Sequence, residues 1–183
     1  MKKFMMVAGV IFLPALCIIV LIMLWNFDSK DMTRDIKQYE EYLGEEGKYK
    51  ENYCLYNDIF PNSITNNMSV EDFCYFYYNP WDACYLGYFV CQYNDSAFEV
   101  EYERLKEIKS AQKPYPYGIK EFPYELCAIY VNDDLGIIYA VADVEKCKIA
   151  YVELQFCNGF TDSEYEKIID KQYLPGGFDV NNK

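Results

Sequence analysis

The stretch Phe73–Tyr93, FCYFYYNPWDACYLGYFVCQY, decides the fold of this chain. It carries one charged residue, Asp82, and is otherwise rich in aromatic and apolar side chains. Two apolar runs that flank a break at Asn79-Pro80 predict two buried β-strands joined by a turn. In the second run, from Tyr85 onward, both sets of alternating side chains are largely apolar. We therefore expect this strand at the middle of a sheet that is covered on both sides.

The segments before this stretch predict one helix and one short strand. Residues Met32, Ile36, Tyr39 and Leu43 recur at helical spacing, which predicts an amphipathic helix over Asp31–Leu43. Gly44 to Gly47 then ends it. The mixed segment Tyr49–Ile59 predicts an edge strand.

The segments after the central stretch predict a helix, a loop, a meander and a last helix. Ser96-Ala97-Phe98-Glu99 is a capping box that opens a helix. The Pro-rich segment Lys113–Tyr124 predicts a loop. Three apolar runs then predict an antiparallel meander, and they are Leu126–Val131, Ile137–Val141 and Ile149–Phe156. Thr161-Asp162-Ser163-Glu164 opens the last helix. Residues 28–183 are thus predicted to form one α+β domain, with a mainly antiparallel sheet packed by about three amphipathic helices.

The N-terminal segment predicts a transmembrane anchor. Residues 4–27 contain no charge, and Lys2 and Lys3 precede them. A stretch of this length can cross a hydrocarbon core of about 30 Å as a helix, and basic residues favour the cytoplasmic side. We expect residues 1–27 to be a signal anchor in the cell membrane, with the N-terminus cytoplasmic and the domain outside. Cleavage by signal peptidase and lipidation at Cys17 remain alternatives.

Charge and composition exclude several classes of function. The formal net charge is −12, and all but two of the 17 basic residues share the domain with all 29 acidic ones. A nucleic acid partner is not expected, because no basic cluster is present to displace its counterions. The chain has no histidine, which excludes Ser-His and Cys-His nucleophile pairs and the common catalytic zinc sites.

The cysteines outside the N-terminal segment leave three interpretations open. They are Cys54, Cys74, Cys84, Cys91, Cys127, Cys147 and Cys157. An odd number leaves at least one without a partner within the chain, and no two form a C-x-x-C motif. Most lie in predicted strands, where cysteine packs as a small apolar residue. Buried thiols, one or more disulfides, and a metal or redox role are the alternatives.

Two groups of carboxylates are candidates for chemistry. Asp133-Asp134 and the pair Asp143 and Glu145 could serve glycoside hydrolysis or bind calcium. Both groups fall at predicted hairpin turns, where Asp is favoured for its own hydrogen bonds, and neither matches a calcium loop. We therefore predict no catalytic, cofactor-binding or metal-binding residue.

Three loop aromatics are the candidate interaction surface. Trp81, Tyr115 and Tyr117 lie in predicted loops, where an exposed ring can anchor a protein interface or stack on a sugar. With 20 tyrosines in the chain, some must be exposed in any fold, so the three residues are candidates for binding and no more.

Four runs carry a resemblance to a known group of proteins. They are Phe60–Ile64, Phe73–Tyr77, Tyr85–Tyr93 and Ala97–Leu105. In their order and character, the chain resembles small uncharacterised extracytoplasmic proteins of Gram-positive bacteria, which pair an anchor or lipoprotein signal with one α+β domain. The resemblance implies location and fold, and the high cysteine content departs from it.

These observations predict a membrane-anchored binding or interaction module of the cell envelope, with an envelope protein as the possible partner. A carboxylate-dependent cell-wall hydrolase and a thiol-based redox sensor are the alternatives.

Overall fold

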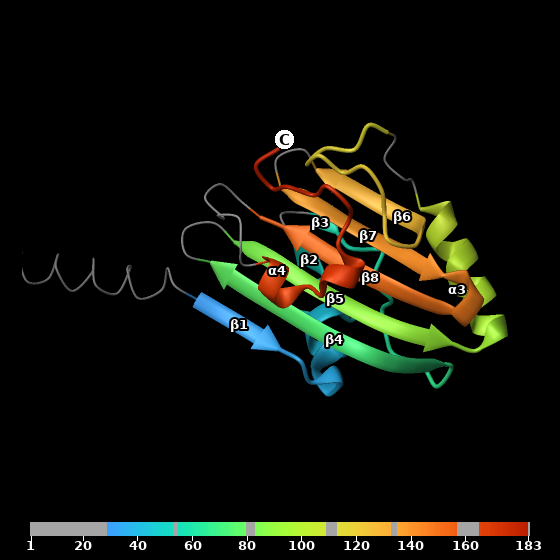
Figure 1. Ribbon diagram of the computed structural model, residues 1–183. Coiled ribbons are helices and arrows are strands. Elements are labelled where there is room, and N and C mark those ends of the chain that lie inside the picture. Colours follow the sequence, from blue (N-terminus) through green and yellow to red (C-terminus); the bar gives the residue numbers. More distant parts are fainter. Residues whose placement is uncertain are drawn as a thin grey trace, which may run out of the picture.

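The chain folds around one six-stranded antiparallel sheet. A computed structural model describes residues 29–52, 55–79, 83–108, 113–132, 135–156 and 165–182. The strands lie in the order β1-β4-β5-β8-β7-β6 (Figure 1). They are β1 (Ser29–Thr33), β4 (Met68–Asn79), β5 (Cys84–Tyr93), β6 (Glu125–Asn132), β7 (Gly136–Asp143) and β8 (Lys148–Gln155). The helices of the described part are α2 (Tyr39–Leu43), α3 (Asp95–Glu107) and α4 (Tyr165–Ile168), with 3-10 turns η1 (Ile36–Gln38), η2 (Val144–Lys146) and η3 (Lys171–Tyr173). The predicted α+β class is confirmed.

The predicted central hairpin is β4 and β5. Tyr75 of β4 pairs with Gly87 of β5, and β5 pairs on its other side with β8. The two alternating sets of β5 side chains enter two different cores, as Phe89 and Leu86 illustrate. The prediction that β5 is a central strand covered on both sides is therefore confirmed. The predicted meander is β6, β7 and β8, and it extends the same sheet.

Helices and loops cover opposite faces of the sheet. The helix face, as we name it, is covered by α2, by residues 57–60 and by α3. The loop face is covered by residues 115–124 and by the C-terminal segment 165–182. In Figure 1, α4 and the red C-terminal segment lie in front of the sheet, whereas β2 and β3 lie behind it.

The first part of the helix predicted over Asp31–Leu43 is wrong. Ser29–Thr33 is the edge strand β1, and Met32 is 49% exposed instead of lying on a buried helical stripe. Pairing with β4, in which Asp31 lies opposite Tyr77, outweighs the helical spacing. Helical structure begins only after Asp35, whose side chain caps η1 by accepting a hydrogen bond from the Lys37 amide at 3.0 Å.

Two further boundaries differ from the sequence prediction. The segment 49–59 holds a small separate sheet, β2 (Glu51–Asn52) with β3 (Leu55–Tyr56), and not an edge strand of the main sheet. The cap of α3 is Asn94, not Ser96, because the Asn94 side chain precedes the helix and accepts from the Ala97 amide at 3.0 Å.

One end of the sheet gathers the start of β1 and the ends of its neighbours. Ser29 pairs with Asn79, Tyr78 with Cys84, and Tyr85 with Gln155. Gln155 in turn pairs with Gly136, the first residue of β7. We call this end the Ser29 end, and it emerges on the left in Figure 1.

The predicted anchor, residues 1–27, lies outside the described residues. Within the ranges that the structure does describe, no helix is both long and apolar enough to cross a bilayer.

Candidate functional site

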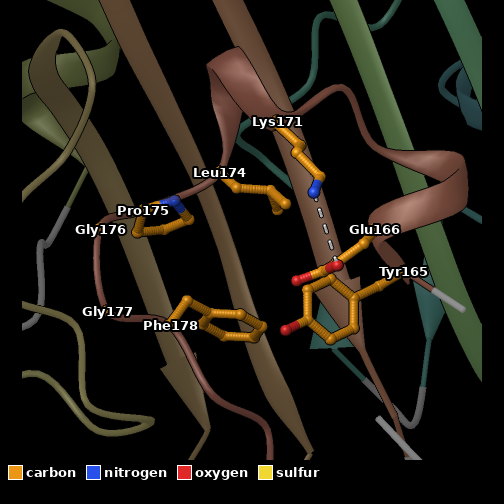
Figure 2. Close-up of a pocket in the computed structure, with 8 residues that line it drawn as sticks. All are labelled: Tyr165, Glu166, Lys171, Leu174, Pro175, Gly176, Gly177 and Phe178. Atoms are coloured by element: carbon orange, nitrogen blue, oxygen red, sulfur yellow. Dashed lines mark ion pairs between the residues drawn. The ribbon is translucent and has the colours of Figure 1, made fainter. Parts of the chain in front are cut away.

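Among the residues that the structure describes, an open hollow on the loop face is the best candidate for a site. We call it the α4 groove, and its volume is about 320 Å³. Figure 2 shows the eight residues that line it, which are Tyr165, Glu166, Lys171, Leu174, Pro175, Gly176, Gly177 and Phe178. All eight come from one C-terminal segment that leaves α4, turns through η3 and runs back across the sheet.

Local hydrogen bonds explain the path of this segment. The Asp170 side chain caps η3 by accepting from the Gln172 amide at 3.1 Å. The Gly176 amide donates to the Glu121 carbonyl, and the Lys120 amide donates to the Gly176 carbonyl, both at 2.9 Å. Gly177 then adopts a positive φ of 81°, which a residue with a side chain rarely does. The backbone on this side of the groove is therefore held to the loop face.

The floor of the α4 groove is aromatic and its rim is charged. The rings of Tyr165 and Phe178 meet edge to face, with centroids 5.2 Å apart. On the rim, Lys171 and Glu166 form an ion pair at 3.9 Å, which Figure 2 marks with a dashed line. Apolar floors with a few polar groups at the edge are typical of binding sites for small ligands or peptide side chains.

A second hollow of about 320 Å³ lies beside α4 and shares Glu166 and Lys171 with the first. Arg34 and Tyr88 complete it from the sheet side. The Arg34 guanidinium donates to the Tyr88 hydroxyl at 3.2 Å, and that hydroxyl donates to Asp72 at 2.7 Å. Burial, and the bond to Asp72, raise the pKa of Tyr88 to about 12. The hydroxyl is therefore a fixed donor and not a general base.

The helix face contains a buried polar network. Glu153 of β8 is fully buried, and it accepts a hydrogen bond from the Tyr75 hydroxyl at 3.0 Å. Gly87 lies between these two residues in the pairing of the sheet. A Cβ atom at Gly87 would lie 2.4 Å from the Tyr75 ring, so the glycine makes room for the ring to reach across to Glu153.

A second set of polar contacts lies under α3. The Tyr151 hydroxyl donates to Glu101 at 2.6 Å and lies 2.6 Å from the Tyr93 hydroxyl. Arg104 donates to both Glu101 oxygens at 2.7 Å and to the Asp58 carbonyl at 2.7 Å. These bonds join α3, the sheet and the loop before β4, so we assign them a structural role.

A lysine is buried at the centre of this cover. Lys50 is 2% exposed and donates to the Phe60 carbonyl at 3.2 Å. Burial lowers its pKa to about 8, although the charges of Asp58 and Glu153 act in the opposite direction. Such a lysine could serve as a base in an open site. Here its side chain is packed under the cover of the helix face, away from both hollows.

The three predicted interaction residues have different outcomes. Trp81 lies outside the described residues. Tyr115 is half-buried and packs edge to face on Phe122 at 5.6 Å, so its contact with a partner stays a prediction. The exposure expected for Tyr117 was wrong: it is 0% exposed, because its hydroxyl donates to the Asn132 carbonyl at 3.0 Å and its ring packs on Phe156.

Those predicted candidates for chemistry that the structure describes do not assemble into a site. Asp143 caps η2 and pairs with Lys146 at 3.0 Å, as its turn position predicts. The pair Asp133-Asp134 lies outside the described residues. Burial raises the pKa of Cys74 to about 11 and those of Cys91 and Cys127 to about 12. In the described ranges, no group of three Cys, Asp or Glu side chains could hold a metal ion.

Sequence reasoning missed the α4 groove, because it predicted only a helix after residue 161 and no site in the segment that follows. The signal that could have found it is the Pro175-Gly176-Gly177 turn, with Tyr173 before it and Phe178 after it, which suits neither a helix nor a strand.

Comparison of the chain with known protein families, with curated proteins and with solved structures found no match.

Proposed function

We propose that this protein is a membrane-anchored binding module of the cell envelope, and that it docks a short segment of another envelope protein in the α4 groove. Residues 4–27 would cross the membrane and the domain would face outward. The observation that carries the proposal is the shape and chemistry of the groove, an open hollow with an aromatic floor of Tyr165 and Phe178 and a charged rim of Glu166 and Lys171.

The size of the groove supports a short segment as the ligand. A hollow of about 320 Å³ is near the lower limit of ligand pockets and is large enough for one aromatic or branched side chain. The rim charges are 49% and 78% exposed on Glu166 and Lys171, so they can pair with a partner at little desolvation cost. A side chain in the hollow and a polar contact at the rim together describe a peptide anchor.

The chemistry of the described residues gives no support to the other two functions. A thiol sensor needs an accessible thiolate, whereas burial raises the pKa values of Cys74, Cys91 and Cys127. Desolvation and the neighbouring Asp95 also raise the pKa of Cys147, which is half-buried. A carboxylate hydrolase needs an acid and a base in one cleft, but Glu166 is the one carboxylate among the residues that line the α4 groove. Asp170 joins Glu166 in the second hollow, but its side chain is occupied as the cap of η3, where it accepts from the Gln172 amide.

Photo-crosslinking in cells tests this proposal. A photoreactive phenylalanine analogue is placed at Lys171 in the full-length chain, and the crosslinked partner is identified by mass spectrometry. A second chain also carries Leu174→Arg, which fills the groove with a long charged side chain. We expect one recurrent adduct, reduced at least tenfold by Leu174→Arg.

The matched control is Val100→Arg on α3. Val100 is 73% exposed on a different part of the domain, so its replacement alters the surface charge equally without entering the groove. The adduct should persist in this variant. An adduct that persists equally in Leu174→Arg, in a protein that resists proteolysis like the parent chain, would refute the groove as the docking site.

A further inference from the structure

The α4 groove lies at the Ser29 end of the sheet, where β1 begins. Phe156 follows β8 directly at this Ser29 end. The rings of Tyr165 and Phe178 pack against Phe156, with centroid distances of 6.3 and 6.2 Å. The aromatic floor of the groove is therefore built on the first residue beyond the strand end.

The register of the sheet sets the separation between the groove and Ser29. Strands β4 and β5 lie between β1 and β8. Three strand spacings of about 4.8 Å separate β1 from β8, and the register sets Gln155 level with Asp31, two residues along β1 from Ser29. The end of β8 therefore lies roughly 16 Å from the start of β1. Only Asp28 separates Ser29 from Phe27, the last residue of the apolar run, and the chain advances at most about 3.6 Å per residue.

The attachment of β1 keeps this arrangement fixed. Asp31 accepts hydrogen bonds from the hydroxyls of Tyr42 and Tyr49 at 2.5 and 2.8 Å and pairs with Lys48 at 2.6 Å. Together with the pairing to β4, these bonds tie the first strand to the domain immediately after the anchor. With Asp28 as the one residue between the apolar run and β1, the sequence leaves no length for a linker that could carry the groove away from the bilayer.

From this placement we infer that the partner of the α4 groove is an aromatic-bearing juxtamembrane segment of a protein in the same membrane. The inference rests on the proposed function, since it names the partner of the same groove. Membrane proteins concentrate Trp and Tyr where a span meets the headgroups. A ring from such a belt suits the edges of Tyr165 and Phe178, because aromatic pairs favour edge-to-face contact.

A spacer series tests the inference separately from the proposed function. One full-length chain carries a rigid helical spacer of about 20 residues between Asp28 and Ser29, which adds roughly 30 Å. A second chain carries a Gly/Ser spacer of the same length, which lets the domain return to the membrane. Both chains also carry the photoreactive group at Lys171.

We expect the rigid spacer to reduce the Lys171 adduct at least tenfold and the flexible spacer to reduce it less than threefold. The adduct should map within about ten residues of a transmembrane span in the partner, at or beside an aromatic residue. An adduct that is unchanged by the rigid spacer, one that maps to a wall-bound or soluble protein, or one that joins two copies of this chain would overturn the inference. In each of these cases, sensitivity to Leu174→Arg in the chain without a spacer would still report on the proposed function.

Discussion

The two faces of the sheet are covered by different kinds of structure. On the helix face, α2, α3 and the loop before β4 enclose a polar network that includes Lys50 and Glu153. On the loop face, a chain with little regular structure lies over an apolar surface of residues such as Leu86 and Val152. The first cover combines ring packing with buried side-chain hydrogen bonds to charged groups. The second combines ring packing with hydrogen bonds to backbone carbonyls, and its described residues leave two hollows.

The largest expected effect is on the helix face, at Glu153. Glu153→Ala removes a carboxylate that accepts a hydrogen bond from the Tyr75 hydroxyl. The negative charge of the same carboxylate favours the charged form of the buried Lys50. Because it leaves a buried cation without that compensation, we expect the free energy of unfolding to fall by about 3 to 5 kcal/mol. Urea unfolding of the full chain in detergent, followed by tyrosine fluorescence, measures this.

A neighbour on the loop face is the control for Glu153. Leu154 is equally buried on the next position of β8, and Leu154→Ala also destabilises the fold. Adding Lys50→Met should recover part of the loss in Glu153→Ala and none of the loss in Leu154→Ala. Equal recovery in both would contradict the coupling.

A pair of tyrosines compares hydrogen bonding on the two faces. Tyr151 and Tyr139 are both fully buried on adjacent strands, but Tyr151 donates to the Glu101 carboxylate and Tyr139 to the Tyr173 carbonyl at 2.7 Å. Because a bond to a charged group contributes more, we expect Tyr151→Phe to cost about 1.5 to 3 kcal/mol and Tyr139→Phe about 1 kcal/mol. Thermal unfolding of the two variants measures both losses of stability. A larger loss in Tyr139→Phe would contradict the stronger hydrogen bond that we assign to Tyr151 on the helix face.

Two glycines compare how tightly each face is packed. At Gly87 a Cβ atom would meet the Tyr75 ring, whereas at Gly176 it would meet the flexible Glu121 side chain at 2.9 Å. We expect Gly87→Ala to lower the unfolding free energy by about 1 to 3 kcal/mol, because the buried ring cannot move freely. Gly176→Ala should lower the unfolding free energy clearly less. Chemical denaturation of the two variants in parallel measures the difference, and equal losses would contradict it.

The smallest effect is acid sensitivity at the β1 end of the helix face. Burial opposes ionisation of Asp31, but the bonds from Lys48, Tyr42 and Tyr49 outweigh it and lower the pKa to about 2. The depressed pKa contributes stability that is present above the ordinary value of 3.8 and is lost as the pH falls toward 2. We expect this contribution to be about 1 kcal/mol, since Asp31 is partly exposed.

Asp31→Asn should flatten that part of the pH profile. Stability measured between pH 5 and pH 2 should fall less steeply in Asp31→Asn than in the parent chain, and the two curves should converge at the acid end. Parallel curves would show that Asp31 does not carry the effect.

Sequence patterns predicted the sheet better than its covers. In β5 both sets of alternating residues are largely apolar, and successive side chains of a strand point to opposite sides of the sheet. The sequence therefore predicted that both faces of this strand are buried. In contrast, Met32 shares helical spacing with Ile36 and Tyr39, but pairing of β1 with β4 places it in a strand. That pairing joins residues about 45 positions apart, which no local pattern reports.

The candidate site was beyond sequence prediction for a related reason. Tyr165 and Phe178 face each other only because the segment between them turns through η3 and is tied to Glu121. Tyr117 was predicted to be exposed because loops usually lie at the surface, but here a loop itself forms part of the core. Glu153 did carry a signal, as an acid between Val152 and Leu154 in an apolar run.

The antiparallel pairing of β1 with β4 also has a mechanical consequence. A pull on the chain at Ser29 acts along the strand, parallel to β4 and perpendicular to the hydrogen bonds between them. Such a load shears all of the β1–β4 bonds together and does not open them one at a time. If residues 1–27 anchor the domain as we propose, a displaced partner in the α4 groove would load the domain through this edge of its sheet, which would resist the force as a stiff connection.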